Sequence, residues 1–328
     1  MPRGAGSETV RFKVTGRFFR ETVLAHPDSH RPSICPRMAG WKGGITGRLA
    51  AVLAMAAVLT LVSGVAVSGE ALTWAVLDFP PFQILDVPHR GTGSFDGLLE
   101  QLVGQMPEYD HHIVPMSFAR RDEELRKKTR FCTPGVFRTP ARIEQGWRFS
   151  LPSLIHLDNR VITLAETASR LGPPGRIDIE ALFGRSDLIG GIVAKRSFAP
   201  NIDAAIERHR GRANLMIRAM RAEQFFQMLL AGQLDYLILF PHEAAYLAER
   251  FGATGRIADR QISGTPPFIF TYVACVGEGW AERMVARINR AIVEIRPTAD
   301  YRALSERWYN SDDKALIRRF VPDLLHED

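Results

Sequence analysis

Short apolar runs and alternating apolar and polar residues recur along residues 72–309. Such runs predict strands, and apolar residues spaced three and four apart predict helices. The predicted strands are 72–79, 111–118, 131–137, 159–167, 187–194, 214–220 (a strand or a linker), 234–240 and 267–277. The predicted helices are 96–106, 120–128, one that starts at Thr139, 177–184, one within 197–210, 222–233, 241–252, 281–296 and 299–309.

Strands and helices alternate in this pattern, which favours an α/β fold with mainly parallel sheets. A second α/β series begins after the loop "LGPPG" at residues 171–175, and a largely helical section follows residue 277. No internal repeat and no low-complexity linker interrupts the pattern. Two α/β series followed by a largely helical section predict two lobes, with the chain crossing from one to the other and back.

An apolar stretch without charges precedes the predicted fold, at residues 49–67. Lys42 and Arg48 come before it, and small residues follow it. A basic start, an apolar middle and a small-residue exit predict a secretory signal peptide over residues 38–68, and hence a periplasmic protein. A retained membrane anchor is the alternative, because the stretch is nearly long enough to span a bilayer. Residues 1–37 are interpreted as a misassigned start or a disordered leader.

The positive charge of the chain is concentrated in this N-terminal region. The formal net charge is +6, but residues 1–68 hold nine basic and three acidic residues, and residues 69–328 hold 33 of each. A neutral body argues against a nucleic-acid partner, which needs a concentrated basic face. The sequence also lacks phosphate-loop, dinucleotide, HExxH, CxxC and GxSxG motifs. We therefore expect no cofactor, no metal and no catalytic centre.

The body of the chain contains two cysteines, Cys132 and Cys275, both in predicted strands. Export would permit a disulfide between them. Buried free thiols are also common, and pairing cannot be deduced from sequence. The sequence leaves both possibilities open.

Several short segments of the sequence occur in an order typical of one protein family. They are "TWAVLDFPPF", "SFARRDEELRKKTRFC", "GVFRTPARIEQGWRFSLPSL", "MLLAGQLDYLIL" and "MVARINRAIVEIRPTADYRALSERWY". Through these segments, the region of about residues 71–310 resembles the family 3 extracellular solute-binding proteins, which have the type II periplasmic binding fold.

The resemblance implies two α/β lobes around an interlobe ligand cleft. Lobe one would comprise residues 69–160 plus 275–328, and lobe two residues 161–274. It also implies a monomer that binds a small molecule and delivers it to the membrane permease of an ABC transporter. The alternatives are a sensing module for a membrane signalling partner, or a lyase or dehydratase-like enzyme that uses an acid such as Glu166 or Glu243.

An arginine stands where a helix is predicted to begin. Thr139-Pro140 is a helix-start signal, yet Arg142 brings positive charge to the positive end of the helix dipole. The resemblance implies that Arg142 grips a ligand carboxylate, with which a guanidinium forms paired hydrogen bonds. We expect free helix N–H groups to add to the same anion site. The alternative is a surface ion pair with Glu144 or another acid.

Aromatic and basic residues near the first strands are further candidates for ligand contacts. Phe79 and Phe118 align with the two aromatic positions that sandwich the ligand in the family, and Phe82 belongs to the same turn as Phe79. Aromatic residues at strand ends are also often core residues. Arg120 points either at the cleft or into solvent, whereas Arg121 is expected on the solvated helix face.

The second lobe offers candidates in two loops. Lys195, Arg196 and Ser197 follow a predicted strand, where relatives place polar ligand contacts; a solvated loop is the alternative. Phe240 stands where amino-acid-binding relatives place the acid that holds the ligand ammonium. We therefore expect an anionic ligand without a free ammonium group. Asp235 is expected to have a structural role at its strand start.

Overall fold

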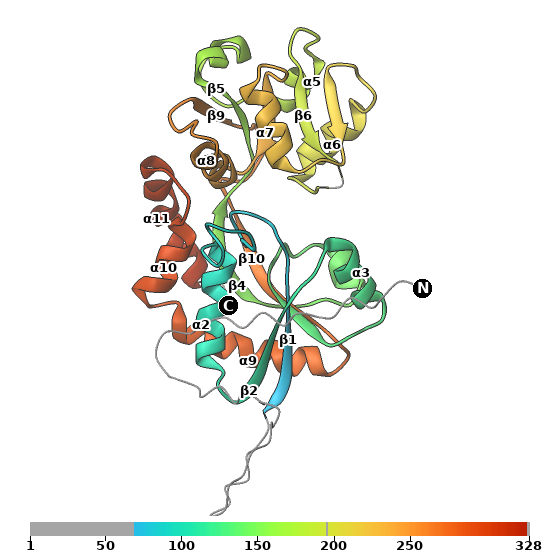
Figure 1. Cartoon of the computed structure of the whole chain (residues 1–328), viewed down its shortest axis with the longest axis vertical. Coiled ribbons are helices and arrows are strands. Elements are labelled where there is room, and N and C mark those ends of the chain that lie inside the picture. Colours follow the sequence, from blue (N-terminus) through green and yellow to red (C-terminus); the bar gives the residue numbers. More distant parts are fainter. Residues whose placement is uncertain (1–68, 195, 327–328) are drawn as a thin grey trace, which may run out of the picture. The chain divides into compact units, whose positions relative to one another are not determined.

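The computed structural model describes residues 69–194 and 196–326, which form two five-stranded sheets with helices around each (Figure 1). These two sheets confirm the predicted α/β architecture. The predicted leader and signal peptide lie outside the described residues. Within the described ranges, no helix is long and apolar enough to cross a membrane.

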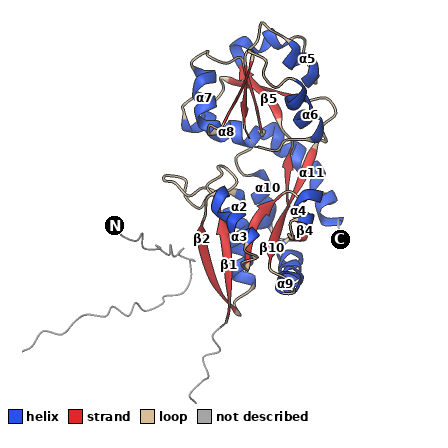
Figure 2. Cartoon of the chain, turned by 90° about the vertical axis from the view of Figure 1, so that its right-hand side faces the viewer, coloured by secondary structure: helices blue, strands red, loops and turns tan. Residues whose placement is uncertain are grey.

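The first sheet has the strand order β2-β1-β3-β10-β4. Its strands are β1 (Glu70–Val76), β2 (Tyr109–Pro115), β3 (Phe131–Val136), β4 (Arg148–Leu157) and β10 (Phe268–Val276). The helices of this part, which we call lobe one, are α2 (Ser94–Gln105), α3 (Phe118–Arg126), α4 (Pro140–Glu144), α9 (Trp280–Ile295), α10 (Ala299–Glu306) and α11 (Ser311–His326). Figure 2 shows α9 beside β4 and β10, two strands that it contacts.

The second sheet has the strand order β7-β6-β8-β5-β9. Its strands are β5 (Arg160–Leu164), β6 (Gly190–Val193), β7 (Leu215–Arg218), β8 (Tyr236–Leu239) and β9 (Ile257–Gln261). The helices of this part, lobe two, are the 3-10 helix η2 (Ala165–Leu171), α5 (Ile179–Gly184), α6 (Pro200–Arg208), α7 (Ala222–Leu230) and α8 (Pro241–Arg250).

Both sheets are mixed, which corrects the expectation of mainly parallel sheets. In lobe one, β10 runs antiparallel to β3 and β4. In lobe two, β5 runs antiparallel to β8 and β9. The antiparallel strands are the ones that adjoin the chain crossings, because the chain leaves lobe one through β4 into β5 and returns through β9 into β10. The second crossing falls between Gln261 and Phe268, earlier than the expected boundary at residue 275.

The apolar core covers both faces of each sheet. In β1, Trp74 packs in one buried cluster and its neighbour Ala75 in another. In β8, Leu237 and Ile238 divide between two clusters in the same way. Neighbouring strand residues point to opposite faces, so each sheet is buried on both sides. This explains why "YLIL", the sequence of β8, is continuously apolar rather than alternating.

Cys132 on β3 and Cys275 on β10 form a disulfide across two adjacent strands. The two residues are direct register partners, and both are fully buried. The structure thus settles the pairing that the sequence left open. Disulfides persist in oxidising compartments, which agrees with the predicted export.

A buried ion network secures the first chain crossing. Arg160, the first residue of β5, donates hydrogen bonds to Asp259 on β9 at 2.8 Å and to Asp313 on α11 at 2.6 Å. Because α11 belongs to lobe one, this guanidinium bridges the two lobes. Its side chain is buried, and so is that of Asp313.

Candidate functional site

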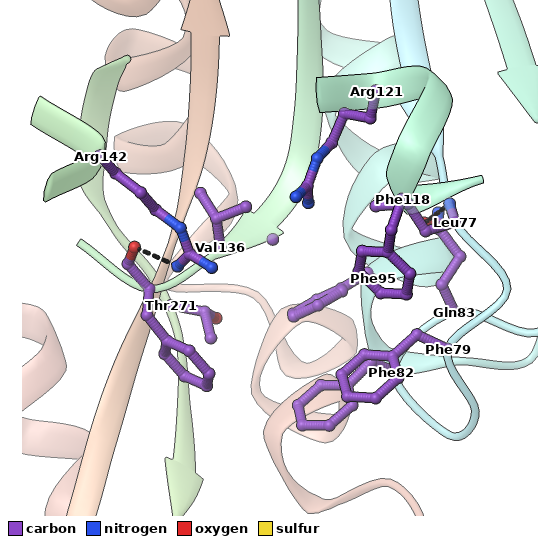
Figure 3. Close-up of a pocket in the computed structure, with 12 residues that line it drawn as sticks. Leu77, Phe79, Phe82, Gln83, Phe95, Phe118, Arg121, Val136, Arg142 and Thr271 are labelled. Carbon is purple, nitrogen blue, oxygen red and sulfur yellow. Dashed lines mark hydrogen bonds between the residues drawn. The ribbon is translucent and has the colours of Figure 1, made fainter. Parts of the chain in front are cut away.

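A cavity of about 80 Å³ lies in lobe one beyond the carboxyl ends of three strands. Its walls come from the segments that follow β1, β2 and β3 together with β10 (Figure 3). The lining residues are Leu77, Phe79, Phe82, Gln83, Phe95, Phe118, Arg121, Gly135, Val136, Phe137, Arg142 and Thr271. Open α/β sheets bind ligands at this end of their strands. Ordinary drug-sized pockets measure roughly 300–1,000 Å³, so this cavity suits a small ligand.

Arg142 lines this cavity from α4. The predicted helix start is confirmed, because Thr139 caps α4 and its Oγ1 accepts a hydrogen bond of 3.3 Å from the backbone N–H of Arg142. That N–H is therefore occupied, and α4 spans only five residues. Of the helix N–H groups expected to contribute to an anion site, the one at Arg142 is therefore not available to a ligand.

The guanidinium of Arg142 is not paired with Glu144. Its Nη1 donates a hydrogen bond of 2.7 Å to the carbonyl oxygen of Phe137, and in the described part of the chain it forms no ion pair. Burial lowers the pKa of Arg142, and the nearby positive charge of Arg121 lowers it further. Both causes disfavour the charged form, and a bound anion would counter both.

Arg121 is the second basic residue on the cavity, and sequence reasoning assigned it to solvent. Figure 3 shows its guanidinium and that of Arg142 directed toward the same space from opposite sides. The side chain of Arg121 is only 12% exposed, and it lies over the rings of Phe118 and Trp147, at 5.3 and 5.9 Å from their centroids. It also hydrogen-bonds the exposed Asp122 at 2.9 Å.

Arg120, the candidate favoured from sequence, is exposed and does not line the cavity. The spacing of residues along the predicted helix could have identified Arg121 as the cavity residue. Residues three apart share a helix face, so Arg121 accompanies Phe118, which already aligned with a ligand-contacting position. Arg120 lies on another face of α3.

The three candidate phenylalanines of lobe one all line the cavity, in different environments. Phe118 is 50% exposed at its edge, whereas Phe82 is only 1% exposed within the core. Phe79 stacks on Phe82 with ring centroids 5.1 Å apart. It meets Phe118 edge-on at 6.3 Å. The rings form one continuous apolar wall, in contact with each other.

In lobe two, Arg196 is held by an acid rather than free for a ligand. Its guanidinium donates hydrogen bonds of 2.9 and 2.6 Å to the two carboxylate oxygens of Glu243. Ser197 is exposed and donates a hydrogen bond to Asp203 at 3.2 Å. Lys195 lies outside the described residues. The expected basic contact from this loop is thus neutralised at Arg196.

The remaining candidates of lobe two are structural in this arrangement. Phe240 is buried at 1% exposure and packs on Phe82, with ring centroids 5.4 Å apart. Asp235 accepts a hydrogen bond of 2.7 Å from the backbone N–H of Ile189, in line with its expected structural role. Glu166, one of the two acids considered for catalysis, is exposed and bonds to Arg256 at 3.4 Å.

The site therefore combines two cations with an aromatic wall. The residues that line the cavity include no aspartate and no glutamate. Among residues 69–194 and 196–326, no cluster of three or more His, Cys, Asp or Glu side chains is arranged to hold a metal ion. Chemically, the arrangement favours a small ligand with an acidic group and an apolar part.

No protein-family model matches the chain, and no curated protein matches it in sequence. Solved structures match it in fold. A substrate-binding protein of an ABC uptake transporter from Streptococcus pneumoniae, with bound histidine, is 16% identical, with a TM-score of 0.57 over 74% of this chain and 93% of its own. The periplasmic VFT2 domain of Bordetella pertussis BvgS is 19% identical, with a TM-score of 0.52 over 73% of this chain and 93% of its own.

A histidine kinase sensor domain described as similar to periplasmic binding proteins is 17% identical, with a TM-score of 0.56 over 74% of this chain and 96% of its own. These neighbours are binding proteins and sensor domains. At identities this low, the structural match shows the fold but does not identify the ligand. The chain has the two-lobed α/β fold of the type II periplasmic binding proteins.

Proposed function

We propose that the protein is an exported solute-binding protein that captures a small carboxylate-bearing molecule. The observation that carries this proposal is the approach of two guanidinium groups, from Arg142 and Arg121, to one cavity whose lining contains no acid. The fold supports it, because the neighbours include substrate-binding proteins. The buried disulfide between Cys132 and Cys275 fits an oxidising compartment.

Arg142 is the proposed anchor for the acidic group. Its planar guanidinium offers paired hydrogen bonds to a carboxylate, and among the described residues a single bond, to Phe137, uses it. Arg121 adds a second positive charge across the cavity. Phe79 and Phe118 supply apolar contact of fixed shape to the rest of the ligand. A neutral molecule would leave the charge of Arg142 uncompensated, because Arg121 already pairs with Asp122.

The proposed cycle is capture followed by delivery. A ligand bound at lobe one would favour closure of lobe two over it, by differential binding to the closed state. The closed form would then be recognised by the membrane permease of an ABC transporter. A catalytic role has less support, since Glu166 is exposed and Glu243 is paired with Arg196.

A sensory role is the second candidate, favoured by the likeness to a histidine kinase sensor domain and to the VFT2 domain of BvgS. Both roles use the same ligand site and differ in the membrane partner. Cross-linking of the liganded protein in its native membrane would separate them: a permease partner supports transport, and a kinase partner supports sensing.

A thermal-shift screen of the full-length protein tests the proposed site. The panel pairs small carboxylic acids with their neutral amides, so that each pair differs only in charge. A ligand at a hundred times its Kd adds about 2.7 kcal/mol of stability, which corresponds to several degrees in Tm. Acids should raise Tm in the wild type and amides should not. Equal shifts from acids and amides, or shifts from cationic amino acids alone, would contradict the proposal.

A further inference from the structure

Arg196 occupies a cage of aromatic rings and one carboxylate. Its guanidinium carbon lies 5.6 Å from the ring centroid of Phe79, 5.3 Å from that of Phe198 and 5.0 Å from that of Phe240. Glu243 accepts its two hydrogen bonds from the same group. Aromatic faces and a carboxylate around a guanidinium are the means by which proteins bind cationic ligands.

This cage adjoins the candidate ligand cavity. Phe79 belongs to both, because it lines the cavity and also lies under the guanidinium of Arg196. Phe240 of the cage contacts Phe137 of the cavity wall, with ring centroids 6.1 Å apart. Arg196 itself does not line the cavity. A single layer of rings therefore separates the tethered cation from the space proposed for the ligand.

We infer that Arg196 fills a cation site of the ligand cleft, so that the protein supplies the positive group that an amino-acid ligand would otherwise bring. The inference rests on the proposed function and refines it: the ligand is an acid without an amino or guanidino group. Glu243, one helical turn after Phe240, is the acid of this site. Arg196 takes the place of an external cation by donating both of its hydrogen bonds to this carboxylate. Removal of the Arg196 side chain should open the cage to an external cation.

The Arg196–Glu243 pair is buried, so replacing the Arg196 side chain by an external cation should have a measurable effect on stability. The side chains of Arg196 and Glu243 are only 10% and 3% exposed. A buried carboxylate that loses its partner is strongly destabilising, so an emptied cage should bind a replacement cation. A purely structural ion pair between the loop and α8 would also weaken the protein when broken. It would not create a site selective for small cations.

The first arm of the experiment measures the Tm of full-length Arg196→Ala with methylguanidinium chloride. The matched additive is N-methylurea, a neutral molecule of similar shape, with sodium chloride added to equal ionic strength. We expect methylguanidinium to recover part of the lost Tm and methylurea to recover none. Arg196→Ala/Glu243→Gln should show no recovery, because the caged carboxylate is gone. Arg256→Ala, from an exposed ion pair, serves as the control and should not respond.

The second arm measures ligand selectivity by calorimetry, with 3-phenylpropanoate against phenylalanine and 4-methylpentanoate against leucine. The members of each pair differ only in the amino group. The wild type should prefer the acid without the amine by at least about tenfold. Arg196→Ala should shift this ratio toward the amino acid by a similar factor. If Arg196→Ala is insoluble, Arg196→Ser, which also removes the guanidinium and leaves the cage open, takes its place in both arms under the same criteria.

The results of the two arms distinguish a failure of the cation-site inference from a failure of the proposed function. If methylguanidinium and methylurea act alike on Arg196→Ala, the cage is not a cation site and the inference is overturned. An unchanged selectivity ratio in the variant overturns it as well. If methylguanidinium restores Tm but the wild type binds no acid of either pair, the cage stands and the proposed function fails.

Discussion

The imidazole rings of His156 and His242 stack across the two lobes, with ring centroids 5.4 Å apart. His156 lies on β4 of lobe one, His242 lies on α8 of lobe two, and both are buried. Burial lowers the pKa of His156 to about 3. Burial, with the positive charges of Arg196 and Arg160 nearby, lowers the pKa of His242 well below its usual value. The interlobe contact therefore depends on two neutral histidines.

Acidification should weaken the protein through this pair. The unfolded chain takes up protons at both histidines below their ordinary pKa of about 6.5, whereas the folded chain does not. Stability is thus fully present above that pKa and falls as the pH drops toward the folded values. The loss at His156 should reach about 2 kcal/mol at pH 5, and His242 should add to it in the same direction. Urea unfolding at pH 7.5, 6 and 5 measures it.

Two variants isolate the contribution of the pair. His156→Gln/His242→Gln should show a shallower dependence of the free energy of unfolding on pH, because neither side chain titrates. His112→Gln serves as the control, since His112 is 43% exposed, and should keep the wild-type dependence. Identical slopes for the wild type and the double variant would refute this account of the histidines.

The disulfide between Cys132 and Cys275 should carry a large share of the stability, because it spans 143 residues of sequence. Cross-linking such distant positions restricts the unfolded chain, and loss of the bond should cost about 2–4 kcal/mol. Cys132→Ala/Cys275→Ala should unfold at lower urea concentration than the wild type. Dithiothreitol should destabilise the wild type and leave the double variant unaffected; a response of both to the reductant would count against the bond.

Local signals in the sequence predicted the local structure well. The helix start at Thr139 needs only its own hydroxyl and Pro140, and the structure contains that cap. The strand β4 was not predicted, because Pro152 interrupts its pattern. The structure supplies the reason that the proline is tolerated: among the strands that the structure describes, β4 lies at the edge of its sheet, next to β10, and edge strands accept proline.

Features that depend on packing could not be predicted. Whether Arg120 or Arg121 faces the cavity depends on which side of α3 packs against the sheet. The Cys132–Cys275 bond depends on β10 returning from lobe two to pair with β3, a long-range register that no local pattern encodes. The engagement of Arg196 by Glu243 joins a loop of lobe two to the first turn of α8 in the same way.

Phe118 and Phe82 should respond differently to truncation, although both line the cavity. Phe82→Ala removes a fully buried ring, and such changes cost about 3–5 kcal/mol. Phe118→Ala removes a ring that is 50% exposed, so its cost should be under about 1 kcal/mol. Urea unfolding compares the two stabilities, and calorimetry with an acid that binds the wild type should show weaker binding by Phe118→Ala. Wild-type affinity in Phe118→Ala would exclude its ring from the ligand site.

The most direct test of the central claim is the affinity of Arg142→Ala for the carboxylic acid that binds the wild type most tightly. Arg138→Ala is the matched control, because Arg138 is exposed and lies outside the cavity lining. Isothermal titration should show that Arg142→Ala loses about 30-fold or more in affinity, as expected when one partner of a buried charge pair is removed. Arg138→Ala should bind as the wild type does. Equal affinity of the wild type and Arg142→Ala would contradict the claim that this guanidinium holds the ligand's acid group.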